Sequence, residues 1–322
     1  MNDARSYGWT LVILLWLATA TNAADVLLIV GAPGTSEYGQ EFQQWQKQWE
    51  SNCQTAGLEL TVISGDDASD EMTNRQSIEK MLASVAGVAS QRPLWIVLIG
   101  HGTWDGNVAN FNLVGPDLDA KTLSGWIASI LRPVVLVNCS SSSGPYIDRL
   151  SGPNRVVVTA TKSGSEQNYA RFGKYFSDAF GSLEADLDHD DSVSVREAFL
   201  KATADTARFY DEQGRLATEH SLLDDNGDQM GSSFDMVRGK KKAKGKAQID
   251  GEFAGRIALP IGRDAPRLND DQLAKRNQLE QQLRELQSNW DSDDRTQLRQ
   301  QALPLLLQLA ELYAQSAENA GE

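Results

Sequence analysis

The pattern of apolar and polar positions predicts an alternation of strands and helices along most of the chain. Short apolar runs bounded by Pro, Gly or small residues are typical of strands buried on both faces. Between them, apolar residues three and four positions apart are typical of helices that cover a sheet. The expected strands are 25–30, 58–63, 94–99, 134–137, 155–159 and 256–259, and the expected helices are 37–55, 73–86, 120–131, 167–180 and 197–209. This order predicts an α/β fold with a mostly parallel sheet and helices on both faces.

The centre of this pattern is the strand–helix–strand unit in residues 93–144. Because such a crossover is right-handed, its strands 94–99 and 134–137 should be parallel neighbours. His101 follows the first strand and Cys139 follows the second. Both side chains should therefore lie at the same edge of the sheet, where open α/β sheets place their sites. A histidine within reach of a thiol is the minimum arrangement for a cysteine nucleophile.

The chemistry of this pair follows from the properties of the two side chains. A thiol is only slightly ionised at neutral pH, and histidine supplies a base or a compensating cation in that range. The backbone amides of Gly102 and of Cys139 itself are expected to converge on an oxyanion, and Gly102 allows close approach of the backbone. The structural alternative is that Cys139 is a small buried apolar residue and His101 a hydrogen-bonded structural one.

The motifs around the pair resemble those of the clan CD cysteine peptidases, the caspase-like group that includes legumain, caspases and gingipains. The chain reads WIVLIGHG up to Gly102 and VVLVNCS from Val134. The resemblance covers residues 25–180 and is closest to the legumain branch. It implies a caspase-like fold, His101 as general base, Cys139 as nucleophile and a peptide or protein as substrate. It implies no cofactor requirement for catalysis.

Several positions depart from the legumain pattern. Gly100 stands where legumain has an aspartate, and Ser140 stands where it has a glutamate. Residues 35–40 hold no arginine for an acidic or asparagine side chain of the substrate, and Tyr38 stands there instead. The prediction is an endopeptidase without an assumed preference for Asn or Asp. The alternatives are a caspase-like domain without turnover that serves as an interaction scaffold, and an esterase or transpeptidase that uses the same pair.

The acidic segment 186–197, DLDHDDSVSVRE, is a second candidate site. Its oxygen-bearing side chains have the spacing of a calcium loop, in which a hard cation takes six to eight oxygens. The expected ligands are Asp186, Asp188, Asp190, Ser192, Ser194 and Glu197. Asp191 stands where glycine normally makes the sharp turn, and Asp tolerates the left-handed conformation. The segment predicts a structural calcium ion, with a solvated acidic turn as the alternative. The shorter acidic stretch 224–228 either completes a neighbouring site or forms a turn.

Charge and the N-terminus bear on partners and location. A net charge of −14 argues against nucleic acid as a partner. The uncharged run 10–20, followed by small residues, predicts a secretory signal peptide over 1–23 and an exported mature chain, periplasmic or secreted. This run is shorter than the roughly 20 residues of a spanning helix, so no stable membrane span is expected after cleavage. An uncleaved anchor is the alternative.

The remaining expectations concern domains and cysteines. Residues 24–262 are expected to form the peptidase-like domain, and residues 263–322 a helical hairpin in which Pro304 kinks the second helix or restarts it. The hairpin is expected to pack on the main domain, form a homodimer or bind a partner. Of the two cysteines, Cys139 is expected to be a free thiol and Cys53 a buried or half-buried one.

Overall fold

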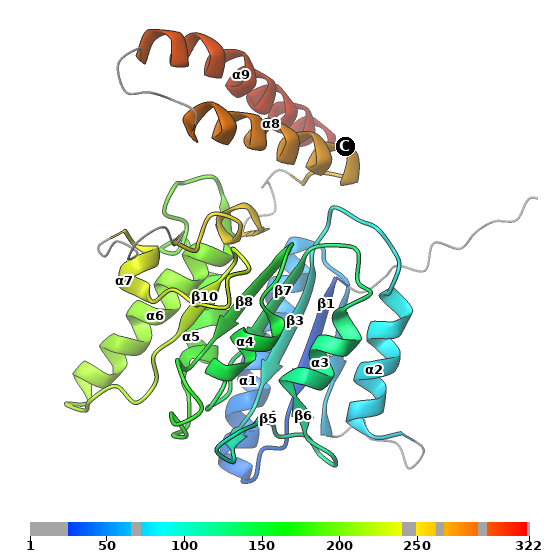
Figure 1. Ribbon diagram of the computed structural model, residues 1–322, viewed down its shortest axis with the longest axis vertical. Helices are drawn as coiled ribbons and strands as arrows, with labels where there is room; N and C mark the ends of the chain where they lie inside the picture. The colour runs from blue at the N-terminus through cyan, green and yellow to red at the C-terminus, as the bar shows by residue number, and fades with distance from the viewer. Residues whose placement is uncertain (1–24, 66–71, 240–248, 262–266, 289–294, 321–322) are drawn as a thin grey trace, which may run out of the picture.

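The computed structural model describes residues 25–65, 72–239, 249–261, 267–288 and 295–320. It shows an α/β body with one central sheet, helices on both faces of the sheet and a helix pair at the end of the chain (Figure 1). This arrangement confirms the predicted α/β class, mostly parallel sheet and C-terminal helix pair. The predicted signal peptide lies outside the described residues.

The central sheet has six strands in the order β10-β8-β7-β3-β1-β2. Their bounds are β1 (Val26–Val30), β2 (Leu60–Ile63), β3 (Leu94–Ile99), β7 (Val134–Asn138), β8 (Arg155–Thr159) and β10 (Leu222–Asp224). All neighbours are parallel except β10, which is antiparallel to β8. Every residue of β1, β3 and β7 is buried, which explains why these strands are continuous apolar runs. β10 was not predicted, because three residues are too few for a periodic pattern.

Two layers of helices cover the sheet. One face carries α1 (Ser36–Ala56), α5 (Phe172–Ala179) and α6 (Val195–Glu212), and the other carries α2 (Asn74–Val85), α3 (Ala120–Ile127) and α4 (Ile147–Leu150) (Figure 1). In β3, Trp95, Val97 and Ile99 pack with the α1 side, whereas Leu94, Ile96 and Leu98 pack with the α2 side. Residues two positions beyond Ile99 therefore continue on the α1 side.

Local signals account for the ends of several helices. Thr35 caps α1, and Gly57 ends it with a left-handed φ of 68°. Thr73 and Gln76 form a capping box at α2. The helix predicted over 167–180 begins only at Phe172, because residues 160–171 form an irregular segment that approaches α5 from the end of β8.

Short elements complete the body. β4 (Gly102–Trp104), β5 (Ala109–Phe111) and β6 (Leu118–Asp119) form a small antiparallel sheet directly after β3. β9 (Ser192–Ser194) pairs with β11 (Ala258–Pro260), and the short helices are η2 (Gly144–Tyr146), α7 (Phe234–Val237) and η3 (Ala254–Arg256). Only β11 was predicted, as the strand 256–259, because the other elements are too short to show a period.

The helix pair consists of α8 (Asp270–Ser288) and α9 (Arg295–Ala320), and it lies at the opposite end of the body from β5 and β6 (Figure 1). Arg92 bonds Asp270 at 3.1 Å, which links the pair to the body. α9 continues through Pro304 as one helix, so the predicted restart is wrong. A cavity of about 1130 Å³ separates the pair from the starts of the strands. Within the described ranges, no helix is both long and apolar enough to cross a membrane.

Candidate functional site

The ends of β3 and β7 bring His101 and Cys139 to one edge of the sheet. Leu98 lies opposite Asn138 in the parallel register, so His101 and Cys139 both follow this matched pair. Cys139 belongs to the core cluster on the α1 side, and the His101 ring contacts Phe42 of α1. Both side chains therefore leave the sheet at the same edge and on the same face, in agreement with the strand–helix–strand expectation.

The backbone and three aromatic rings hold the His101 ring. Its Nε2 atom lies 3.1 Å from the carbonyl oxygen of Pro33. Because a carbonyl oxygen only accepts, Nε2 carries the proton and Nδ1 remains the basic nitrogen. The rings of Tyr38, Phe42 and Tyr169 lie 4.7, 5.2 and 5.7 Å from the imidazole. This is the arrangement of a base whose orientation is set by a third group.

The Cys139 thiol is covered. Only 1% of the residue is exposed. A Cβ atom added at Gly173 would lie 2.6 Å from Cys139 Cβ, 3.0 Å from Sγ and 2.9 Å from the ring of Trp45. Burial raises the pKa of the thiol, and the negative charge of Glu219 raises this pKa further. A reactive thiol needs access and a lowered pKa, so this conformation holds Cys139 as a protonated core residue.

The two expected oxyanion donors differ in their surroundings. A Cβ atom at position 102 would lie 2.1 Å from the carbonyl oxygen of Ser141, so this close approach of the backbone requires glycine at position 102. The N–H of Gly102 donates to Ser141 Oγ at 3.4 Å. The N–H of Cys139 donates to the Leu98 carbonyl at 2.9 Å. This differs from the expectation of a free amide, because the hydrogen-bond ladder between β3 and β7 continues one residue further.

Residues 160–171, here named the covering segment, lie over this edge between β8 and α5. The Tyr169 ring packs on Tyr38 and Trp45 at 4.6 and 6.2 Å, and its hydroxyl donates to Glu41. The carbonyl of Glu166 accepts the N–H of Ser142 at 2.8 Å. The helix expected over 167–180 would include Tyr169, because its aromatic spacing with later residues resembles a helical stripe.

Glu219 fixes the junction between the covering segment and α5. It is 5% exposed, and its carboxylate accepts the N–H groups of Arg171 and Phe172 at 2.9 to 3.0 Å and the Tyr210 hydroxyl at 3.0 Å. Burial raises the pKa of Glu219, whereas these hydrogen bonds lower it. No local pattern identifies this residue, because its partners at the start of α5 lie 47 and 48 positions away in sequence.

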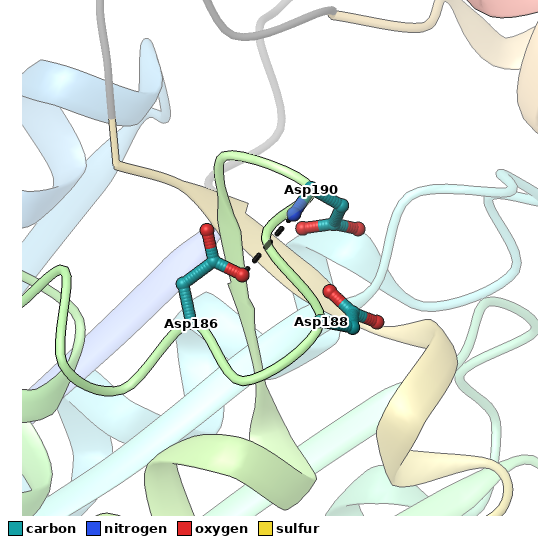
Figure 2. Close-up of side chains that lie close together, drawn as sticks. All are labelled: Asp186, Asp188 and Asp190. Carbon is teal, nitrogen blue, oxygen red and sulfur yellow. Dashed lines mark hydrogen bonds between the residues drawn. The ribbon is translucent and has the colours of Figure 1, made fainter.

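The acidic loop 186–197 brings three of its predicted ligands together. Carboxylate oxygens of Asp186, Asp188 and Asp190 all lie within 4.8 Å of one another (Figure 2). Asp186 accepts the N–H groups of Asp190 and Asp191 at 3.2 and 3.1 Å. Asp191 has a φ of 63°, the left-handed conformation expected at the glycine position. The loop thus presents three carboxylates to one point, which suits a hard divalent cation.

The other predicted ligands are arranged differently. Glu197 accepts the N–H of Leu187 at 2.8 Å, so its carboxylate reaches the loop. The Ser194 hydroxyl caps α6 and bonds Glu197, and Ser192 donates its N–H to Asp190 at 2.9 Å. Partial burial, followed by the charge of Asp188, raises the pKa of Asp190 to about 6. The carboxylates therefore repel one another in the absence of a cation or proton.

Comparison with known proteins finds similar solved structures but no matching sequence. No family profile and no curated protein matches the sequence. The structure is similar to the initiator caspase Dronc of Drosophila, with 14% identity and a TM-score of 0.41 over 65% of this chain and 82% of that chain. It is also similar to caspase-1 of Spodoptera frugiperda, with 10% identity and a TM-score of 0.40 over 63% and 86% of the two chains. TM-scores below 0.5 assign no residue and no activity.

Proposed function

We propose that this chain is an exported cysteine endopeptidase of the caspase-like type, closest to the legumain branch, with Cys139 as nucleophile and His101 as base. The observation that carries the proposal is the adjacency of β3 and β7, which brings both residues to one edge and one face of the sheet. The hydrogen bond from His101 Nε2 to Pro33 supports it, because it leaves Nδ1 free to accept a proton.

The proposed reaction uses groups of this chain alone. His101 Nδ1 takes the thiol proton, and the sulfur of Cys139 attacks the carbonyl carbon of the substrate peptide bond. The Gly102 N–H exchanges its hydrogen bond to Ser141 Oγ for one to the developing oxyanion. His101 then returns the proton to the leaving amine, and water hydrolyses the thioester to release the second product. Because the thiol packs against Gly173 and Trp45 in this conformation, these neighbours must move before a peptide reaches Cys139.

A second candidate function is an interaction scaffold that has lost turnover. Two observations favour it: Cys139 is 1% exposed, and its N–H is already bonded to Leu98. Burial and the negative charge of Glu219 keep the thiol neutral, which opposes nucleophilic attack. The two candidates differ in one property, namely whether Cys139 becomes accessible to a peptide.

A peptide-library cleavage assay on the full chain separates the two functions. Wild type and Cys53→Ala are expected to cleave, and Cys139→Ala is expected to be inactive. Cys53 is the matched control, because it is also a free thiol and 1% exposed, and burial raises its pKa to about 12. Absence of cleavage by folded wild type would favour the scaffold. Equal cleavage by wild type and Cys139→Ala would rule out Cys139 as the nucleophile.

We further propose that the loop 186–197 binds a structural calcium ion through Asp186, Asp188 and Asp190. The support is the convergence of their carboxylate oxygens within 4.8 Å and the approach of Glu197 to the same loop. Calcium prefers carboxylate and carbonyl oxygens in a flexible geometry. The ion would join the end of α5 to the start of α6 and takes no part in the proposed cleavage.

A further inference from the structure

A second loop repeats the oxygen spacing of the acidic loop at a different place in the fold. Residues 224–235 read DDNGDQMGSSFD and begin at the last residue of the edge strand β10. Asp224, Asn226 and Asp228 occupy the first, third and fifth positions, as Asp186, Asp188 and Asp190 do in the first loop. The second loop is followed by the short helix α7, and the first by α6.

The two loops also share a backbone conformation. Their fourth residues, His189 and Gly227, have φ values of 61° and 80°. Their sixth residues, Asp191 and Gln229, have φ values of 63° and 65°. A left-handed φ is uncommon outside glycine, so its presence at both positions of both loops indicates the same turn.

In each loop, the carboxylate of the fifth residue accepts the N–H of the residue two positions further along the chain. Asp190 Oδ1 accepts the N–H of Ser192 at 2.9 Å, and Asp228 Oδ1 accepts the N–H of Met230 at 2.8 Å. This bond uses one oxygen of each carboxylate. The other oxygen is left to a different partner.

The observation that points to a ligand is a buried carboxylate oxygen in the second loop. Asp224 is 0% exposed, and its Oδ2 accepts no hydrogen bond from any residue that the structure describes. Its Oδ1 accepts the Ser151 hydroxyl at 2.8 Å. Burial raises the pKa of Asp224, the hydrogen bond from Ser151 lowers it, and the negative charges of Asp228 and Asp225 raise it further. The Ser151 hydroxyl also accepts the N–H of Gln229 at 3.1 Å, so the Asp224 carboxyl lies beside the sixth residue of the loop.

A buried oxygen of this kind is costly unless something binds it. An unpaired buried carboxylate loses its hydration without compensation, and native structures leave few such groups unsatisfied. The loop is also anchored from outside, because Asp250 accepts the N–H groups of Asp225 and Asn226 at 2.9 and 3.3 Å. Asp250 adds a further carboxyl to the surroundings and supplies no cation. A hard cation would satisfy Asp224 Oδ2 and reduce the repulsion from Asp228.

We propose that the loop 224–228 is a second site for a hard divalent cation, Ca²⁺, held by Asp224 Oδ2 together with the side chains of Asn226 and Asp228. Ser151, in the turn after α4, bonds both Asp224 Oδ1 and the N–H of Gln229. The ion would therefore join β10 and its loop to the turn that leads into β8. This site does not depend on the proposed peptidase activity or on calcium binding by the first loop.

Calcium titration calorimetry on the full chain tests the proposal. The variants are Asp228→Asn for the second loop, Asp190→Asn for the first loop and Asp211→Asn as a matched exposed control on α6. Asp228→Asn is expected to bind one ion fewer than wild type, and Asp190→Asn is expected to keep the ion that Asp228→Asn loses. The control is expected to bind as many ions as wild type.

Two controls accompany the titration: a test that each variant is folded, and a comparison of Mg²⁺ binding with Ca²⁺ binding. Circular dichroism establishes that each variant is folded, and Asp224→Asn is expected to lose the same ion as Asp228→Asn. Mg²⁺ is expected to bind at least tenfold more weakly, because it demands a near-octahedral site. Equal numbers of calcium ions on wild type and folded Asp228→Asn would overturn the second site. Loss of an ion from Asp190→Asn alone would leave only the first loop as a calcium site.

Discussion

The sheet edge around Cys139 and the two acidic loops differ in the surroundings of their ionisable groups. At the edge, the thiol is neutral, packed against Gly173 and Trp45, and its N–H is already bonded. In the first loop, three carboxylates lie close to one another, and the pKa of Asp190 in this loop and of Asp224 in the second loop is raised. At the edge, the packing and hydrogen bonds of Cys139 are already satisfied, so the proposed cleavage requires a movement that exposes the thiol. In the loops, the proposed cation would offset the repulsion between the carboxylates.

The largest expected effect is on packing at the edge. Gly173→Ala should destabilise the protein by about 1–3 kcal/mol, because the new methyl group overlaps Cys139 and Trp45. Gly125→Ala is the control, since a Cβ atom there meets nothing within 4 Å and a helical Gly→Ala change usually gains about 0.5–1 kcal/mol. Urea denaturation measures both. Equal stability of Gly173→Ala and wild type would mean that the edge is looser than its packing indicates.

The next effect concerns access to the thiol. Tyr169→Ala removes the ring that packs on Tyr38, Trp45 and His101. Labelling of Cys139 by a small thiol reagent should become about tenfold faster, which corresponds to roughly 1.4 kcal/mol less opening free energy. Tyr175→Ala on α5 is the matched control, because this tyrosine is also half-buried and its ring is paired with Lys174. Equal acceleration in both variants would show general loosening and no specific cover at Tyr169.

The smallest effect concerns charge in the first loop. In chelator, Asp190 has a folded-state pKa of about 6, above its ordinary value of 3.8, so the folded state binds the proton more tightly. Its contribution to stability is therefore highest below about pH 4 and falls as the pH rises through 6. At pH 7 Asp190→Asn should stabilise the protein by less than about 1 kcal/mol, since the side chain is exposed.

Calcium should reverse the sign of that difference. With a saturating ion, wild type gains the binding free energy and Asp190→Asn gains less, so the variant becomes the less stable protein. Thermal unfolding at pH 4, 5, 6 and 7, with chelator and with calcium, measures the difference. The same order of stability in both conditions would contradict calcium binding by this loop.

The sequence by itself determined the architecture and the positions of the candidate groups. Apolar runs and three- and four-residue spacings are local, so they predicted the five parallel strands and the covering helices other than α4 to within a few residues at most ends. The same logic put His101 and Cys139 at one edge, because strand ends in a crossover unit must meet there. The alternating oxygens of 186–190 likewise predicted their convergence.

Only the tertiary structure decided whether those groups are accessible. Tyr169 bonds Glu41 across 128 positions, and Glu219 holds the start of α5 from 47 positions away. Gly173 covers Cys139 although 34 residues separate them in the chain. Such contacts depend on how whole elements pack, and no local period encodes that packing. Side-chain spacing therefore determined which groups meet, and long-range packing determined that the thiol is buried where they meet.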